Sequence, residues 1–184
     1  MNLFGLNNVY TQTLRNVLII IAVLTVAGFV LRCVAERENK FGIIAGYLLK
    51  LVTIGAAGIF LYFTVLNRGT HIERAGDLIP FHSYVQAIKA VKPDYLGDGF
   101  YVIIFNLALT YPLGFFLCLS HDRVKIGKTI LTLAILSILA ETIQFIFALG
   151  YYEVDDVINN VLGGTFGYLV AFAFKRIIQR FDNK

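Results

Sequence analysis

Two apolar stretches in the second half of the chain carry carboxylate and amide side chains. Glu141 and Gln144 lie three residues apart in "ETIQ", and Asp156 and Asn160 lie four residues apart in "DDVINN". Side chains at these spacings share one face of a helix. Carboxylates and amides that converge can transfer protons or position a polar ligand. We therefore take Glu141, Asp156 and Asn160 as candidate catalytic residues.

The helices that must position these groups are membrane spans. The chain has 184 residues, of which 58% are hydrophobic and 15% charged, and its mean hydropathy is +0.72. One small soluble core cannot bury that much apolar surface. Runs close to the ~20 residues that cross a bilayer recur five times. We predict an all-α bundle in a single domain, residues 1–184, with spans near 14–34, 41–66, 100–120, 127–149 and 157–174.

The distribution of Lys and Arg predicts the orientation of this bundle. With five spans, ten of these residues fall on the side of the C-terminus and five on the other side. The positive-inside rule then places the N-terminus outside and the C-terminus in the cytoplasm of a bacterial cell membrane. The net charge of +4 needs no nucleic-acid partner, because the excess cations lie where anionic headgroups would be.

The long outer loop, residues 67–99, contains a short helical pattern. Phe81, Tyr84, Val85, Ile88 and Val91 recur at helical spacing, which predicts an amphipathic helix. Such a helix either lies in the outer membrane interface or covers the bundle.

Four loop residues have side chains that bind metals in other proteins: His71, Glu73, Asp77 and His82. Their spacing fits no metal motif, so we expect neither a metal nor another cofactor.

The polar groups are predicted to converge at one depth. The runs 127–149 and 157–174 are joined by a short connection and should be antiparallel neighbours. At 1.5 Å per residue, Glu141 lies roughly 10 Å, Asn106 roughly 9 Å and Asn160 roughly 6 Å below the outer boundary. Gly163 and Gly167 continue the stripe of Asn160 as a GxxxG pair, which serves either a contact within the chain or a dimer.

Five further residues are candidate ligand-binding groups: Asn106, Gln144, Asp155, Asp77 and Lys50. For Asn106 and Gln144 the alternative is a hydrogen bond that only holds helices together. Lys50 either pairs with Glu141 or extends its side chain to the cytoplasmic face.

Four ordered motifs resemble the VanZ-like family of bacterial membrane proteins. They are "DLIPF", "FNLALTYPLG", "ETIQ" and "DDVINNVLGGTFGY", and they cover about the last 110 residues. By the resemblance, signature positions are Asn106, Pro112, Gly114, Glu141, Gln144, Asp156, Asn160 and Gly163.

Two positions depart from the family pattern. Asp77 stands where relatives usually have asparagine, and no arginine occurs a few residues before the acidic pair. If that arginine binds an anionic ligand in relatives, Arg68 or Arg74 from the long loop is a possible substitute.

The resemblance implies a role in low-level tolerance of teicoplanin, a lipid-bearing glycopeptide antibiotic that acts at the outer face of the membrane. Two mechanisms stay open. In one, the polar pocket binds or remodels a lipid-bearing partner, either the antibiotic or a cell-wall precursor. In the other, the protein is a hydrolase or transferase that acts on a lipid-linked substrate with Glu141 as general base.

Overall fold

A computed structural model describes residues 9–37, 39–69, 75–91, 98–121 and 125–182. Apart from turns and connecting segments, the described part consists of helices and two strands of two residues each. Its α-helices are α1 (Val9–Ala35), α2 (Lys40–Leu61), α3 (His82–Lys89), α4 (Asp98–Ser120), α5 (Ile126–Ile146) and α6 (Val154–Asp182). A π-helical turn, η1 (Tyr62–Leu66), extends α2, and the strands are β1 (Gly76–Asp77) and β2 (Tyr152–Glu153).

Five of the helices are long and apolar enough to cross a membrane, as the sequence predicts. Two of the predicted bounds that differ lie beside the acidic residues. α5 ends at Ile146, three residues before the prediction, and α6 begins at Val154, three residues before it. Asp155 and Asp156 therefore lie in the first turn of α6, where carboxylates favour the positive end of the helix dipole.

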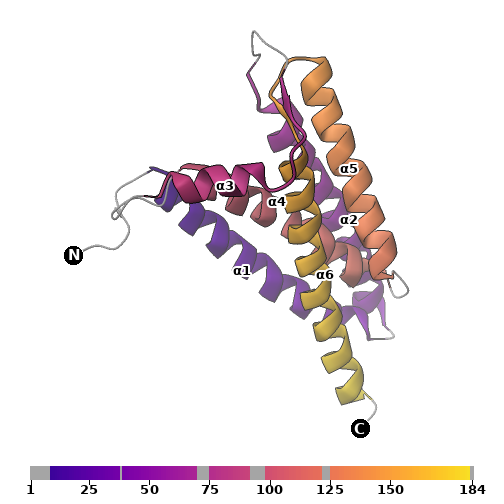
Figure 1. The fold of residues 1–184 in the computed structure, drawn as a ribbon. Helices are drawn as coiled ribbons and strands as arrows, with labels where there is room; N and C mark the ends of the chain where they lie inside the picture. The colour runs from indigo at the N-terminus through magenta and orange to yellow at the C-terminus, as the bar shows by residue number, and fades with distance from the viewer. Residues whose placement is uncertain (1–8, 38, 70–74, 92–97, 122–124, 183–184) are drawn as a thin grey trace, which may run out of the picture.

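α4 and α6 pack side by side through small residues, and they form the centre of the bundle (Figure 1). A Cβ added at Gly163 would lie 2.1 Å from the carbonyl oxygen of Leu107, and one at Gly167 would lie 2.1 Å from that of Tyr111. Both glycines therefore allow the backbone of α4 to approach within the same chain. Of the two uses predicted for the GxxxG pair, the structure contains the contact within the chain.

α1 converges on the other helices only toward its C-terminal end (Figure 1). There Gly28 faces the rings of Phe115 and Phe116 on α4. Toward the N-terminal end, Leu18 and Ile19 are more than half exposed. The two ends of α1 therefore differ in packing, which leaves space beside α4 and α6.

α3, β1 and β2 lie at one end of the bundle, which we call the α3 end (Figure 1). β1 and β2 pair in parallel, with Gly76 opposite Tyr152 and Asp77 opposite Glu153. α3 packs against the start of α4 through Ala87, while Val85 and Ile88 are exposed. α3 thus covers α4 with one face and presents apolar side chains on another. The strand pair was not predicted.

Candidate functional site

The predicted polar residues of α4, α5 and α6 are brought together at the α3 end. Asn106 on α4 donates a hydrogen bond to the carboxylate of Asp156 on α6. Asn160, one turn further along α6, donates to the hydroxyl of Ser137 on α5 at 2.8 Å. All four side chains are buried, so these bonds join three helices inside the bundle.

Glu141 is fully enclosed and has a partner for each oxygen. Its Oε1 accepts a hydrogen bond from Gln144 Nε2 at 3.3 Å. Its Oε2 accepts one from the backbone N–H of Glu153 at 3.2 Å. The side chain is 1% exposed. Glu141 therefore ties the end of α5 to the segment that leads into α6.

Asp155 holds α3 in place. Its Oδ1 accepts from the N–H of Phe81 at 2.6 Å, and its Oδ2 accepts from the N–H and the hydroxyl of Ser83 at 2.8 and 2.6 Å. The backbone N–H groups at the start of a helix lack partners within it, so this carboxylate acts as a cap supplied by a distant part of the chain. Both oxygens of this candidate ligand-binding residue are used within the protein.

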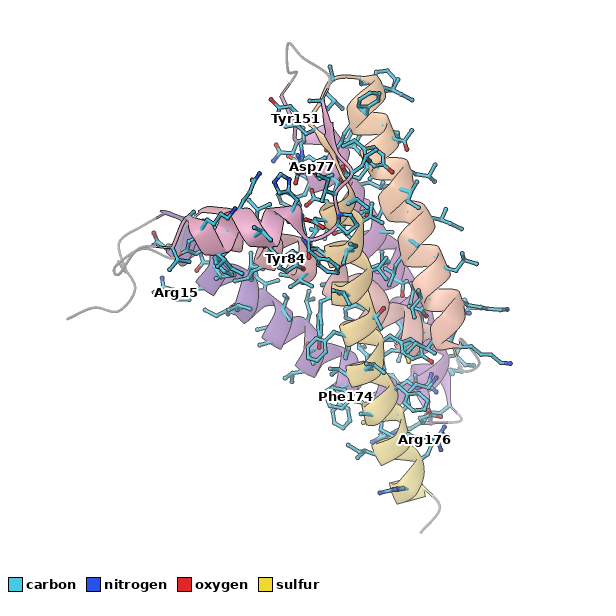
Figure 2. All side chains as sticks on the ribbon, viewed as in Figure 1. Arg15, Asp77, Tyr84, Tyr151, Phe174 and Arg176 are labelled. Carbon is cyan, nitrogen blue, oxygen red and sulfur yellow. The ribbon has the colours of Figure 1, made fainter. Side chains whose placement is uncertain are left out.

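A second contact fixes the side of α3 that faces α6. The hydroxyl of Tyr84 donates to Oδ1 of Asn159, which is 1% exposed. The sequence pattern did not predict this contact, although Asn159 stands directly before the candidate residue Asn160. In Figure 2, the side chain of Tyr84 lies on the side of α3 that is close to α6.

Asp77 and Glu153 face each other in the strand pair but have opposite electrostatic surroundings. Asp77 accepts from the N–H of Ile79 at 3.1 Å and pairs with His82, and these bonds lower the pKa of its carboxyl. Burial, and then the charge of Asp77, raises the pKa of the Glu153 carboxyl. Glu153, which is half-buried, was not among the predicted site residues, because nothing in its spacing distinguishes it from a loop residue.

A cavity of about 400 Å³ opens between α3, the start of α4 and the start of α6. Two carboxylate residues, Glu153 and Asp156, border it, whereas Glu141 does not. Asp156 is 8% exposed, and within the described residues only its Oδ1 has a hydrogen-bond donor. The remaining lining residues are Ser83, Gln86, Ala87, Ala90, Gly99, Val102 and Ile103.

An apolar groove of about 580 Å³ lies along the same two helices, α4 and α6. Ile104 on α4 lines the groove and directly follows Ile103, which lines the cavity. On α6 the groove reaches Gly163, roughly 10 Å along the helix axis from Asp156. The other lining residues are Leu18, Ile21, Leu107, Ala108, Tyr111, Leu162 and Phe166.

Arg68 approaches the acidic residues from the end of the π-helical turn. The position of a Cβ on Gly150 would be 3.2 Å from Nη1 of Arg68 and 2.8 Å from Oε1 of Gln144. The guanidinium also acts electrostatically on Glu141, Glu153 and Asp156. Of the two predicted substitutes for the missing arginine, Arg68 lies beside the site. Arg74 lies outside the described residues, as do the loop residues His71 and Glu73.

Lys50 lies away from this site. Its Nζ is 5.7 Å from the centre of the Tyr47 ring, and the residue lines a different cavity, at the opposite end of the bundle. Glu141 has its partners in Gln144 and Glu153. The structure does not pair Lys50 with Glu141, because α2 packs against α1 and α4 and presents Lys50 at the opposite end of the bundle.

Comparisons with known proteins relate the sequence to one family. A family model described as VanZ/LLP1 matches residues 47–175. A curated relative, Protein VanZ from Enterococcus faecium, is 27% identical over 126 residues, which cover 68% of this chain and 69% of the relative. No solved structure matches.

Proposed function

The chain belongs to the VanZ/LLP1 family of multi-pass membrane proteins, and from this premise we propose that it binds a lipid-bearing ligand at the α3 end. The proposed ligand is a teicoplanin-type lipoglycopeptide antibiotic or a cell-wall precursor. Its polar part would occupy the acidic cavity and its acyl chain the apolar groove. Binding or remodelling this ligand would give tolerance of the antibiotic.

The α3 end is proposed to face the outside of the cell. In the sequence, ten Lys and Arg residues flank the five spans on the side of the C-terminus, against five on the other side. This difference supports a cytoplasmic C-terminus by the positive-inside rule. The proposed orientation puts the cavity on the side where such antibiotics and precursors are displayed.

The observation that carries the proposal is that a cavity bordered by two carboxylates and an apolar groove are both lined by α4 and α6. Asp156 borders the cavity, and Gly163 on the same helix borders the groove. Ligand sites typically combine a largely apolar lining with a few convergent polar groups. An amphiphile that follows α6 from Asp156 to Gly163 would meet both surfaces in the right order.

We favour binding over catalysis because of the surroundings of Glu141. Each oxygen of this carboxylate already accepts a hydrogen bond, and the residue does not border the cavity. A general base must reach the proton that it removes, directly or through one water. Asp156 and Glu153 are the carboxylates that border the cavity, and Asn106 holds the Asp156 side chain in place by a hydrogen bond.

The test measures binding of teicoplanin, and of teicoplanin without its acyl chain, to the protein in phosphatidylcholine nanodiscs. We expect the acylated form to bind more tightly, and Asp156→Asn to weaken that binding about tenfold through loss of a charged partner. Thr142→Ala is the matched control, because Thr142 Oγ1 bonds only to its own helix at Ile138. Equal binding by wild type and Asp156→Asn would contradict the proposal.

A second variant pair tests the groove. Leu18 lines the groove and is 51% exposed, whereas Leu131 on α5 is 60% exposed and lies outside it. Leu18→Trp should fill the groove and reduce both acylated-antibiotic binding and tolerance, and Leu131→Trp should change neither. Mass spectrometry of the bound ligand then separates the two mechanisms, since a new product in place of retained ligand would support the enzyme.

A further inference from the structure

A second cavity, of about 310 Å³, lies at the end of the bundle opposite to α3. It lies between the last turns of α1, the first half of α2 and the end of α4. The residues that define its chemistry are Arg32, Gly46, Tyr47, Lys50, Leu119 and Ser120. Two of these side chains are cationic, and none of the lining residues is acidic.

Lys50 is the unusual member of this cavity, because it lies within a membrane-spanning helix. Its Cα is about 15 Å along the axis from the start of α2. A lysine at such a depth is costly unless its ammonium group finds a partner or reaches the interface. Within the described residues, no carboxylate pairs with it.

The direction of the Lys50 side chain shows where a partner would be. Its ammonium group lies over the ring of Tyr47, which is almost one turn closer to the start of α2. Lysine side chains in helices lean toward the N-terminus in this way and extend to the interface. The charge is therefore directed along the cavity toward the end of the bundle.

Arg32 and the start of α2 add positive potential to the same cavity. Arg32 donates to the carbonyl oxygen of Leu119 at 3.0 Å and pairs with Glu36. Glu36 offsets part of that charge, but it does not line the cavity. Asn39 caps α2 at this end, so the positive end of the α2 dipole also lies there.

We propose that this cavity binds the phosphate of an anionic lipid headgroup, with Lys50 as its principal ligand. The neighbouring surface of α2 suits the acyl chains, because Ile43, Tyr47 and Leu51 are each more than 60% exposed. Basic pockets between membrane helices bind phosphate-bearing lipids in this manner. The same chemistry fits free phosphate, so the experiment separates the two sources.

The test compares retention of phosphatidylglycerol and phosphatidylcholine by the purified full chain, measured by native mass spectrometry. Wild type should retain phosphatidylglycerol preferentially. Lys50→Met should reduce that retention about fivefold, equivalent to about 1 kcal/mol, and Lys50→Arg should restore most of it. Lys128→Met is the matched control, because Lys128 is exposed on α5 outside the cavity.

A pair of glycine variants tests whether the lipid binds in this cavity, without changing any charge. A side chain at Gly46 or Gly55 would meet no atom within 4 Å, and only Gly46 lines the cavity. Gly46→Leu should therefore reduce lipid retention, whereas Gly55→Leu should not. Unchanged retention in both Lys50→Met and Gly46→Leu would overturn the proposal.

A titration with inorganic phosphate tests whether the cavity binds the free ion instead of a lipid phosphate. Calorimetric titration of the protein in phosphatidylcholine nanodiscs with inorganic phosphate should give no Lys50-dependent binding. Lys50-dependent binding of phosphate, without preference for phosphatidylglycerol, would identify a site for the free ion and overturn the lipid proposal.

Discussion

Glycines make both the contact between α4 and α6 and the contact between α1 and α4, but the two contacts differ in kind. A Cβ at Gly114 on α4 would lie 1.7 Å from the carbonyl oxygen of Gly164 on α6. A Cβ at Gly28 on α1 would lie 2.6 Å from a ring carbon of Phe115. A ring can turn away from a new methyl group, but a helix backbone moves only with the whole helix. The first contact is therefore rigid and the second adaptable.

This difference matches the placement of the two surfaces proposed to bind the lipid-bearing ligand, the acidic cavity and the apolar groove. Asn106 and Asp156, which border or support the acidic cavity, lie on the rigid pair α4 and α6. The apolar groove has α1 as its third wall, through Leu18 and Ile21. Polar recognition needs fixed geometry, whereas acyl chains of different length need a wall that can shift. The comparison predicts that the two contacts respond differently to the same substitution.

The largest effect is expected for Gly114→Ala. The new methyl group overlaps the backbone of α6, and overpacking of this kind costs about 3 kcal/mol or more. Thermal unfolding of the purified protein, read by circular dichroism, should show a strongly lowered midpoint or no folded protein at all. Gly55→Ala is the control, since Gly55 faces open space on α2 and alanine favours the helix. A small change in Gly114→Ala would show that α4 and α6 can move apart cheaply.

The next effect concerns α3, whose first turn the carboxylate of Asp155 attaches to α6. Asp155→Asn replaces one acceptor oxygen by a donor that faces the donors of Phe81 or Ser83. Loss of hydrogen bonds to a charged group costs about 2 kcal/mol, so α3 should detach more often than the bundle unfolds. Hydrogen exchange at the amides of α3 should accelerate, with little change in α4 and α6. Glu36→Gln, at the opposite end, should leave exchange in α3 unchanged.

The sequence was sufficient to predict the helices and the convergence of their polar groups. Five apolar runs correspond to five spans, because length and hydropathy alone specify a membrane helix. Asn106 meets Asp156 as predicted, and Asn160 meets Ser137 on α5 because a short connection forces α5 and α6 to be antiparallel neighbours. Depth along a helix follows directly from residue number.

What the sequence did not predict depends on rotation about helix axes and on loop paths. From the residue numbers, Lys50 was expected at nearly the same depth in the membrane as Glu141. In the structure its ammonium group lies over the ring of Tyr47 on its own helix. Arg68 lies beside Gly150 from the segment that follows the π-helical turn, and the path of such a segment leaves no periodic pattern in the sequence. The pairing of Asp77 with Glu153 joins segments about 75 residues apart, and two-residue strands have no periodicity to read.

A smaller effect is expected for Gly28→Ala, the counterpart of Gly114→Ala on α1. Because the atoms in the way belong to the rings of Phe115 and Phe116, the loss of stability should be about 1 kcal/mol. The same thermal unfolding series measures it beside Gly114→Ala and Gly55→Ala. The order of the three midpoints is the result to check, with Gly28→Ala between the other two. Equal losses at Gly28 and Gly114 would remove the distinction between the two contacts.

The smallest effect is a pair of opposite pH dependences at the α3 end. Burial raises the pKa of Glu153 above 4.5, so the folded state holds its proton more tightly than the unfolded state. Stability from this group therefore falls as pH rises from about 4 through the raised pKa, and Glu153→Gln should raise the unfolding midpoint at neutral pH but not at pH 4.

His82 lowers the pKa of Asp77 below 3.8, so Asp77 stabilises the folded state at neutral pH, and this contribution is lost as pH falls through the lowered pKa. Asp77→Asn should accordingly lower the midpoint at neutral pH. Midpoints of the two variants that shift in the same direction at neutral pH would show that the facing carboxylates do not have the opposite surroundings described for them.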